Sequence, residues 1–479
     1  MRLAALLVVA GCSADVIEVR IIIDSPPAGS SAAAFPDLDT VEMSVALAGE
    51  PLPLVVQTFK KGEDIELPDM PYGENLVVHM IGRVGSSEVA VGRTCPFSIR
   101  TGEDPPSPHL YFARTVKWAE FAEPTSATRD GATALTDFEG NALYIGGVDQ
   151  TAIPLSGIDR FDTMNGRFEQ VAQVEPRRSG AAAQLGDGRI VIGGGTTPSG
   201  VASDILEVVD LQAASDRRVE KVIATTALVG TSAPSMVATS DGHVVAFGGS
   251  NTMGKAVSTI VDIRAVGAVP EQRELPRAQL AIPRKQHTVT RLSDDLGAPI
   301  LVIGGLDAME QPVARAELYK PLIEEMAPAS QFSPNMIVPR RDHEAVRLPD
   351  GSVLVVGGID VNNMPVRKLE IFTFDSGFQL AGELPASAGV IDFTITPLPD
   401  GSILLAGGRD ENNNPVATSF IVRLDPADGE LDVVTTDRLT SPRARHQATL
   451  LCDGTVMLVG GTLIAAPAER YNPPSAGRR

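Results

Sequence analysis

Three arginine–histidine pairs are the residues whose types and spacing bear most directly on chemistry. In each pair a histidine follows an arginine by three residues; the pairs are Arg284 and His287, Arg340 and His343, and Arg443 and His446. The planar guanidinium group can hold a carboxylate or another polar ligand through two parallel hydrogen bonds. The same repetition also fits a scaffold in which these side chains bond to neighbouring loops. The sequence leaves both interpretations open.

Metal binding by the three histidines is not expected. Zinc or copper requires ligand atoms within about 2.0–2.3 Å of one ion, whereas His287, His343 and His446 belong to three separate repeats. The chain has no His-Glu-x-x-His element and no paired-cysteine motif. No metal and no cofactor is therefore predicted.

A second recurring group is acidic. Aspartate recurs in polar loops, five residues before a proline, at Asp149, Asp307, Asp360 and Asp410. Carboxylate and amide oxygens suit calcium, but Asp and Asn are also typical of tight turns. Because the spacing lacks the glycine and the terminal glutamate of a helix-loop-helix calcium site, the turn interpretation is favoured.

The arginines and histidines lie within a repeat. Seven short apolar runs each end in a Gly-Gly pair, at spacings of 48 to 56 residues. The pairs begin at Gly146, Gly194, Gly248, Gly304, Gly357, Gly407 and Gly460. Such runs are typical of strands buried on both faces. Six residues before most pairs a glycine recurs, usually after an aspartate, which predicts a tight hairpin turn. Each repeat therefore predicts four strands, the content of a propeller blade.

The last repeat ends after its third strand, near residue 471. The best donor of a fourth strand is the stretch 115–121, which precedes the first repeat and contains Trp118, the single tryptophan of the chain. Its addition would close a ring and leave no open sheet edge.

The pattern resembles the kelch family of β-propellers, in which an arginine lies near the first strand, Gly-Gly follows the second and a tyrosine lies in the third. The resemblance covers residues 114–475, although the third and sixth repeats lack the arginine. It implies an all-β fold with a seven-bladed kelch-like propeller. It also implies that a set of residues faces the central opening and binds a ligand: Arg129, Arg177, Arg284, His287, Arg340, His343, Arg443 and His446. A copper-radical oxidase of propeller type would need a neighbouring cysteine and tyrosine, which the repeats do not visibly supply.

The N-terminus resembles a bacterial lipoprotein signal. Arg2 and an apolar run precede Val9-Ala10-Gly11-Cys12, which is similar to a lipobox. This predicts a signal peptide over 1–11 and a lipid on Cys12, with an ordinary secretory signal as the alternative. The run is too short to span a bilayer. Ser13 after the cysteine favours the outer membrane of a Gram-negative cell, on either its periplasmic or its cell-surface face.

Composition fits an extracytoplasmic monomer that touches the membrane only through its lipid. With 60 acidic and 40 basic residues, the chain has a formal net charge of −20, which argues against sequence-independent binding of nucleic acid.

Residues 12–103 contain short alternating apolar runs separated by turn clusters, which predict a small β-sandwich, immunoglobulin-like or prealbumin-like. A Pro-rich stretch over 104–113 predicts a stiff linker. A spacer role is favoured over independent binding. Cys95 and Cys452 are expected to be separate thiols rather than a disulfide, because they lie in different predicted domains.

Catalytic motifs of defined sequence are absent: there is no Gly-x-Ser-x-Gly elbow, phosphate-binding loop or sialidase-type box. We therefore expect a non-catalytic envelope lipoprotein that binds a protein or glycan. Two alternatives stay open. One is an enzyme that acts on envelope carbohydrate through an acid–base carboxylate pair, and the other is a purely structural envelope component.

Overall fold

The computed structural model describes residues 3–6, 19–65, 72–121, 129–215, 217–223, 234–264, 271–275, 279–323, 325–326, 334–425, 430–461 and 468–474. In these residues the fold consists of β-strands and two short 3-10 helices, η1 (Phe35–Asp37) and η2 (Pro321–Ile323). None of the helices described is long and apolar enough to cross a membrane. Cys12 and the rest of the lipobox lie outside the described residues, so the lipidation stays a prediction.

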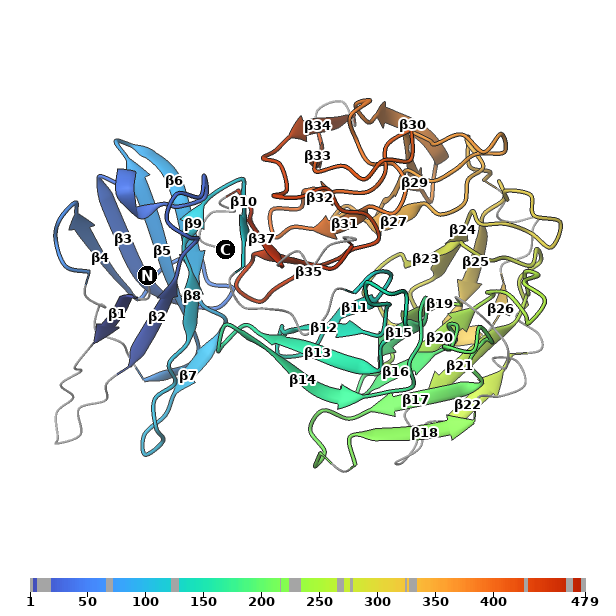
Figure 1. Cartoon of the computed structure of the whole chain (residues 1–479), viewed down its shortest axis with the longest axis horizontal. Coiled ribbons are helices and arrows are strands. Elements are labelled where there is room, and N and C mark those ends of the chain that lie inside the picture. Colours follow the sequence, from blue (N-terminus) through green and yellow to red (C-terminus); the bar gives the residue numbers. More distant parts are fainter. Residues whose placement is uncertain are drawn as a thin grey trace.

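Most of the chain after residue 116 forms antiparallel four-stranded sheets (Figure 1). Seven of them occur in the described residues, and we number them in chain order. Sheet 1 contains β11 (Thr133–Thr136), β12 (Ala142–Ile145), β13 (Gly157–Asp162) and β14 (Arg167–Gln173). Sheet 2 contains β15 (Ala181–Gln184), β16 (Ile190–Gly193), β17 (Ile205–Val209) and β18 (Val219–Ile223). Sheet 3 contains β19 (Ser235–Ala238), β20 (Val244–Phe247), β21 (Ile260–Arg264) and β22 (Glu271–Glu274).

The remaining sheets repeat this order. Sheet 4 contains β23 (Thr288–Arg291), β24 (Ile300–Ile303), β25 (Glu317–Lys320) and β26 (Glu325–Met326). Sheet 5 contains β27 (Glu344–Arg347), β28 (Val353–Val356), β29 (Lys368–Thr373) and β30 (Gly377–Glu383). Sheet 6 contains β31 (Thr394–Pro397), β32 (Ile403–Ala406), β33 (Ser419–Leu424) and β34 (Leu431–Thr435). Sheet 7 contains β35 (Gln447–Leu450), β36 (Val456–Val459), β37 (Glu469–Asn472) and β10 (Lys117–Glu120).

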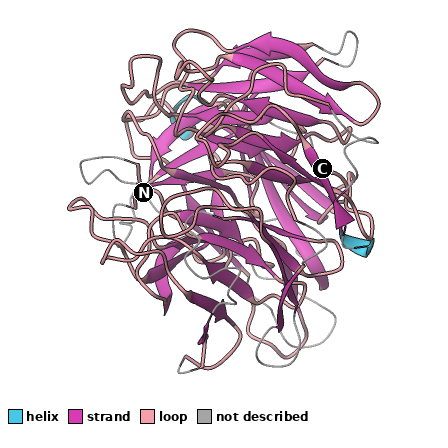
Figure 2. Cartoon of the chain, turned by 90° about the vertical axis from the view of Figure 1, so that its right-hand side faces the viewer, coloured by secondary structure: helices cyan, strands magenta, loops and turns pink. Residues whose placement is uncertain are grey.

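The sheets are arranged as a β-propeller. The first strand of each sheet contacts the first strand of the next, and β35 contacts both β31 and β11, so the contacts run full circle (Figure 1). Figure 2 shows the strands from the side. Every residue of the seven second strands is buried, as the apolar runs predict. Burial of each larger apolar side chain in these strands, such as valine, leucine or isoleucine, stabilises the folded state by about 1.5–3 kcal/mol.

The strand that completes sheet 7 comes from the other end of the chain. β10 pairs antiparallel with β37, and Trp118 lies opposite Tyr471. Their ring centroids are 4.9 Å apart. The Trp118 Nε1 donates a hydrogen bond to Ser419 Oγ of sheet 6 at 2.9 Å. The contact therefore joins the residues before sheet 1 to the last two sheets.

Two further sheets form the N-terminal part. One has the order β4 (Val55–Lys60), β3 (Thr40–Leu47), β5 (Gly73–Val84), β6 (Ser87–Arg93) and β9 (Ala113–Arg114), with β7 (Phe97–Ile99) paired to β5. The other contains β1 (Leu3–Leu6), β2 (Arg20–Asp24) and β8 (His109–Tyr111). Side chains of both sheets share one apolar core, which includes Ile23, Met43, Val78 and Leu110. Because β8 belongs to this core, the predicted linker over 104–113 ends before His109.

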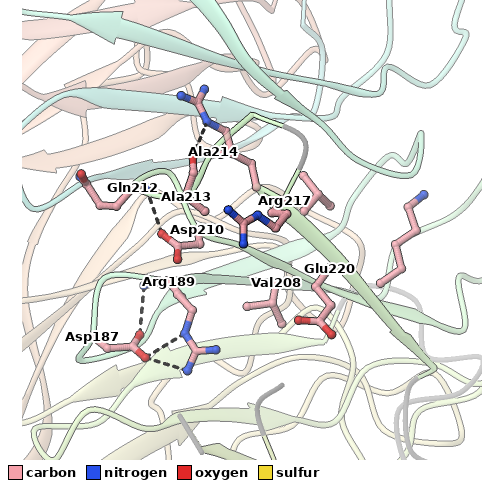
Figure 3. Close-up of a pocket in the computed structure, with 12 residues that line it drawn as sticks. Asp187, Arg189, Val208, Asp210, Gln212, Ala213, Ala214, Arg217 and Glu220 are labelled. Atoms are coloured by element: carbon pink, nitrogen blue, oxygen red, sulfur yellow. Dashed lines mark hydrogen bonds and ion pairs between the residues drawn. The ribbon is translucent and has the colours of Figure 1, made fainter. Parts of the chain in front are cut away.

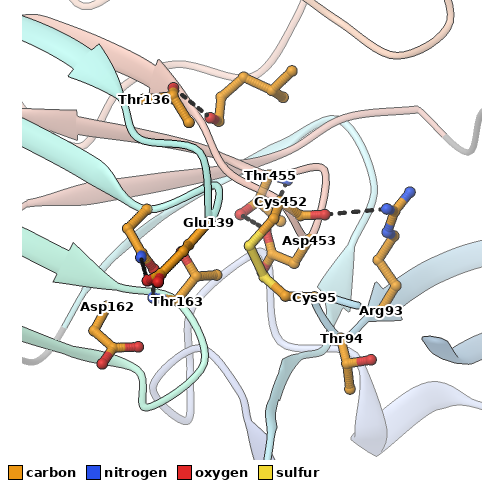
Figure 4. The surroundings of a disulfide bond; sticks show 12 residues. Arg93, Thr94, Cys95, Thr136, Glu139, Asp162, Thr163, Cys452, Asp453 and Thr455 are labelled. Atoms are coloured by element: carbon orange, nitrogen blue, oxygen red, sulfur yellow. Dashed lines mark hydrogen bonds between the residues drawn. A yellow bond between two sulfur atoms is a disulfide. The ribbon is translucent and has the colours of Figure 1, made fainter. Parts of the chain in front are cut away.

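A disulfide between Cys95 and Cys452 ties the N-terminal sheets to sheet 7 (Figure 4). The expectation of separate thiols was wrong, because the fold brings together two residues 357 positions apart. Around the bond, the Arg93 Nη2 donates to the Cys452 carbonyl at 3.1 Å. Asn472 Nδ2 donates to the carbonyls of Val91, at 3.0 Å, and Ala113, at 2.7 Å. The two parts of the chain are thus joined covalently and by hydrogen bonds.

Replacing both cysteines by serine is expected to lower the free energy of unfolding by about 2–4 kcal/mol, because a cross-link across so long a loop restricts the unfolded chain. Denaturant titration of the wild type and the Cys95→Ser/Cys452→Ser variant measures the difference. Reductant should destabilise the wild type and leave the double variant unchanged. Equal stabilities without reductant would contradict a stabilising bond.

Candidate functional site

The five arginines predicted from the repeats are buried, with exposed fractions of 0–2%. In each case the Nη1 donates to the carbonyl of the first glycine of a Gly-Gly pair. The contacts are Arg129 to Gly146 at 2.7 Å, Arg177 to Gly194 at 2.9 Å, Arg284 to Gly304 at 3.0 Å, Arg340 to Gly357 at 3.0 Å and Arg443 to Gly460 at 2.9 Å. Each guanidinium therefore links the start of its sheet to the end of the second strand.

Each arginine also pairs with a buried carboxylate on the third strand of its sheet. The partners are Asp159, Glu207, Glu317, Glu370 and Glu469. In sheet 5 the Arg340 Nη2 lies 2.5 Å from Glu370 Oε1, and the Glu370 carboxylate also accepts from the backbone amides of Ile337 and Val338. We call each arginine–glycine–carboxylate set a brace. The carboxylates were missed, although a spacing of 30 residues from the arginine in sheets 1, 2 and 5 was a visible signal.

The three predicted histidines are buried between neighbouring sheets. The His343 Nε2 lies 2.9 Å from Thr288 Oγ1 of sheet 4, and His446 Nε2 lies 2.9 Å from Thr394 Oγ1 of sheet 6. A Cβ added to Gly304 would lie 2.3 Å from His343 Cε1, so only glycine leaves room for the ring. Burial, and after it the positive charge of the nearby brace arginine, lowers the pKa of each of the three histidines to about 3.

The structure places all eight residues of the predicted ligand site in the interior. Arg129, Arg177, Arg284, His287, Arg340, His343, Arg443 and His446 are buried at 6% exposure or less. Their packing within and between sheets leaves them no face toward a ligand. Within the described residues, no group of three or more His, Cys, Asp or Glu side chains is placed to hold a metal ion.

The recurring aspartates after the Gly-Gly pairs accept hydrogen bonds from backbone amides of their own loops. Asp149 Oδ1 accepts hydrogen bonds from the backbone amides of Thr151 and Ile153, at 2.8 and 3.0 Å. The hydrogen bond from the Ile153 amide is the main cause that lowers the pKa of Asp149. Asp307, Asp360 and Asp410 accept the same two bonds. The turn interpretation is confirmed.

A charged cluster surrounds the end of the propeller at which the first strands begin. The turn into these strands has a left-handed residue in six sheets: Gly131, Ser179, Gln286, Asp342, Asp392 and Arg445. Adjacent turns are bonded to one another, since the Gly131 amide donates to the Arg445 carbonyl at 3.0 Å and the Arg445 amide to the Asp392 carbonyl at 2.8 Å. We call the charged residues here the mouth: Asp130, Arg341, Asp342, Glu344, Asp392, Arg409 and Arg445.

Three ion pairs compensate most charges of the mouth. Arg445 Nε lies 3.2 Å from Asp130 Oδ1, Arg409 Nε lies 3.0 Å from Asp392 Oδ2, and Arg341 Nη1 lies 2.5 Å from Asp342 Oδ2. All six side chains are 22–42% exposed. Burial is the main cause that raises the pKa of Asp130 and of Asp342. The mouth is therefore a cluster of positively and negatively charged side chains that solvent can reach.

Glu344 is the exception, because its side chain makes no hydrogen bond or ion pair with any described residue. Its counterparts Thr288 and Thr394 contact a histidine of the next sheet. In sheet 6 the histidine position is occupied by Phe393, which has no polar atom to offer. The Glu344 residue is exposed, yet desolvation of its carboxyl group by the surrounding protein, with the negative charge of Asp342 as the second cause, raises its pKa to about 7. Glu344 could not be singled out from the sequence, because the lack of a partner for its side chain depends on two sheets together.

A cavity of about 970 Å³ lies beside the outer strands of sheet 2 (Figure 3). Several of the charged side chains that line it are bonded to one another or to backbone carbonyls. Arg189 Nη2 lies 2.7 Å from Asp187 Oδ2, and Arg218 donates to the carbonyls of Ala213 and Val171. The mouth, with one uncompensated carboxylate, is the stronger candidate.

Comparison with known proteins supports a propeller. Residues 398–433 match the family described as "Domain of unknown function (DUF5122) beta-propeller". No curated protein matches the chain. Among solved structures, a fungal alcohol oxidase of the AA5 family in complex with copper is similar, with a TM-score of 0.56, 16% identity, and coverage of 75% of this chain and 76% of that one. The structure of YjhT gives a TM-score of 0.43, 12% identity, and coverage of 64% and 94%. At 16% identity the likeness to the alcohol oxidase concerns the fold alone.

Proposed function

We propose that this chain is a non-catalytic binding protein whose kelch-like, seven-bladed propeller takes a protein or glycan ligand at the mouth. The observation that carries the proposal is the contrast between buried and exposed charges. The brace arginines make their ion pairs inside their own sheets. In contrast, Arg409, Arg445 and Glu344 are reached by solvent at the mouth. A polar ligand can contact these side chains without any change in the sheets.

We further propose that the protein is an envelope lipoprotein, anchored through Cys12 in the outer membrane and facing either the periplasm or the cell surface. The lipobox-like residues 9–12 support this assignment. The Cys95–Cys452 disulfide also supports it, because such bonds persist in oxidising compartments. The N-terminal part, as a small β-sandwich joined covalently to sheet 7, would act as a rigid spacer between lipid and propeller.

Removing two mouth arginines tests the binding site. In chemical crosslinking on intact envelopes, the Arg409→Ala/Arg445→Ala variant is expected to differ at least tenfold from the wild type in the amount of ligand captured, because it removes two side chains of the mouth and leaves Asp130 and Asp392 without their cations. Both arginines belong to exposed ion pairs, which contribute about 1 kcal/mol or less to stability, so the variant should fold. Arg423→Ala is the matched control, since Arg423 is 49% exposed beside Asp400, at the Asp-Gly turn of sheet 6. Equal capture by all three proteins would contradict binding at the mouth.

A second candidate function is hydrolysis of envelope carbohydrate. It is favoured by the raised pKa of both Glu344, at about 7, and Asp342. A carboxyl group with a pKa near 7 can donate a proton to a leaving group. Release of sugar ends from envelope glycan by the wild type, abolished in Glu344→Gln, would establish an enzyme. Binding of envelope glycan without release of sugar ends would support the non-catalytic function.

A further inference from the structure

An arc of exposed apolar side chains lies on the loops that follow the Gly-Gly pairs. Five adjacent sheets contribute to it, with exposed fractions of 54–79%. We call these residues the apolar arc: Ile153, Val201, Met253, Met309, Val361 and Met364. The equivalent loop of sheet 7 lies outside the described residues. The arc thus follows the loops of five adjacent sheets at one end of the propeller.

The loops of the arc are next to the mouth. Backbone bridges join Val148 to Asp130 and Ile359 to Arg341, which places the starts of these loops against mouth residues. At the tip of the sheet 5 loop, Asn363 Oδ1 accepts a hydrogen bond from the Arg341 Nη2 at 3.3 Å. Any macromolecule that reached the mouth would therefore meet the apolar arc as well.

The turns themselves do not require apolar side chains. Sheet 6 builds the same turn, with the same Asp410 hydrogen bonds, from polar residues. At the positions of Val361 and Met364 it has Glu411 and Asn414. Exposed apolar patches mark interaction sites, and the flexible thioether of methionine adapts to varied surfaces. The arc therefore points to a protein partner rather than to a requirement of the fold.

The charge of the partner follows from Glu344. The other charged residues of the mouth form ion pairs at 2.5–3.2 Å, so Glu344 is the acidic side chain of the mouth without a cation among the described residues. Arg178, at the equivalent position of sheet 2, is an exposed cation without an ion pair in the described part of the chain. The chain as a whole is acidic, with a formal net charge of −20, which attracts basic partners over a distance. A cationic side chain would complete the mouth by a charge-assisted hydrogen bond.

We propose that the mouth and the apolar arc together bind an extended protein segment in which a lysine or arginine pairs with Glu344 and flanking apolar side chains contact the arc. This inference rests on the proposed function and narrows its ligand to a basic, apolar peptide segment. The loops supply apolar contact area, and Glu344 supplies the selection for positive charge.

A displayed library of random twelve-residue peptides tests the inference. It is selected in parallel on the immobilised full chain and on the Glu344→Gln variant. Peptides enriched on the wild type are expected to share a lysine or arginine between apolar residues. Glu344→Gln should weaken their binding at least tenfold, as should exchange of the peptide lysine for norleucine. Glu344→Thr, which installs the residue found at 288 and 394, should weaken it equally.

The arc is tested with the same peptides. Met309→Ser/Met364→Ser should weaken their binding about tenfold, whereas Phe138→Ser should not. Phe138 is 69% exposed in the turn at the other end of sheet 1. Binding unaffected by Glu344→Gln, or no enriched peptide, would overturn the inference. Enrichment of acidic peptides that depend on Arg409 and Arg445 would also overturn it while leaving the mouth as the binding site, whereas equal envelope capture by the wild type and the Arg409→Ala/Arg445→Ala variant would remove the mouth itself.

Discussion

Acidification from pH 7 to pH 5 is expected to destabilise the propeller by about 2 kcal/mol for each of its three buried histidines, or about 6 kcal/mol together. Burial lowers the pKa of His287, His343 and His446 to about 3 in the folded chain. In the unfolded chain a histidine has a pKa near 6.5. The unfolded state therefore binds these protons below pH 6.5 and the folded state does not. Stability is complete above pH 6.5 and falls by about 1.4 kcal/mol per histidine for each pH unit below it.

Sheet 6 supplies the control for this prediction. Phe393 occupies the histidine position there and is 4% exposed, which shows that a phenyl ring fits the junction between sheets. The variant His287→Phe/His343→Phe/His446→Phe should lose most of the slope of unfolding free energy against pH between 5 and 6.5. Glu344 acts in the opposite sense: its raised pKa gives stability at low pH that is lost as the pH rises toward 7, but solvent keeps this contribution small. An unchanged slope in the triple variant would contradict neutral buried histidines.

Removal of one brace arginine is expected to have the next largest effect. Arg340→Ala should lower the free energy of unfolding by about 3–5 kcal/mol, because it leaves Glu370 buried without its cation. Glu370 is fully buried, and the carbonyls of Gly357 and Lys368 lose their donor as well. Denaturant titration measures the loss. Arg423→Ala, which breaks an exposed pair, should change stability by about 1 kcal/mol or less.

The coupling between the two brace residues can be tested with a natural replacement. Sheet 6 has Val390 and Phe420 at the positions of Arg340 and Glu370, and both are buried. Replacing both members of a buried ion pair by apolar residues is less harmful than removing one. Arg340→Val/Glu370→Phe should therefore be more stable than either single variant. A double variant as unstable as the sum of the singles would contradict a coupled pair.

The repeat itself was predictable from local signals. Second strands such as β28 and β32 are uninterrupted apolar runs, and the Asp-Gly and Gly-Gly positions mark their two ends. These features depend on residues close in sequence, so the sequence displays them directly. Pairing of β10 with β37 was also accessible, because the last repeat lacked a strand.

The role of the site residues was not accessible in the same way. Whether Arg340 is exposed depends on Glu370, 30 residues away on another strand. The disulfide depends on how the N-terminal sheets meet sheet 7. The Glu344 side chain lacks a partner because the next sheet has Phe393 in place of a histidine. The partner of Cys95 and the neighbour of Glu344 are brought in by the fold from outside the repeat. The 30-residue spacing of Arg340 and Glu370 recurs in the sequence, but it does not show that the pair is buried.

We propose that partners meet this propeller at the mouth and the apolar arc. Site-specific photo-crosslinking on intact envelopes tests it most directly, with the photoreactive residue placed at Met309 or, as a control, at Phe138; these side chains are 78% and 69% exposed. The account predicts a discrete crosslinked product from position 309 that disappears with Glu344→Gln, and none from position 138. Products from position 138 alone, or equal products from both, would contradict it.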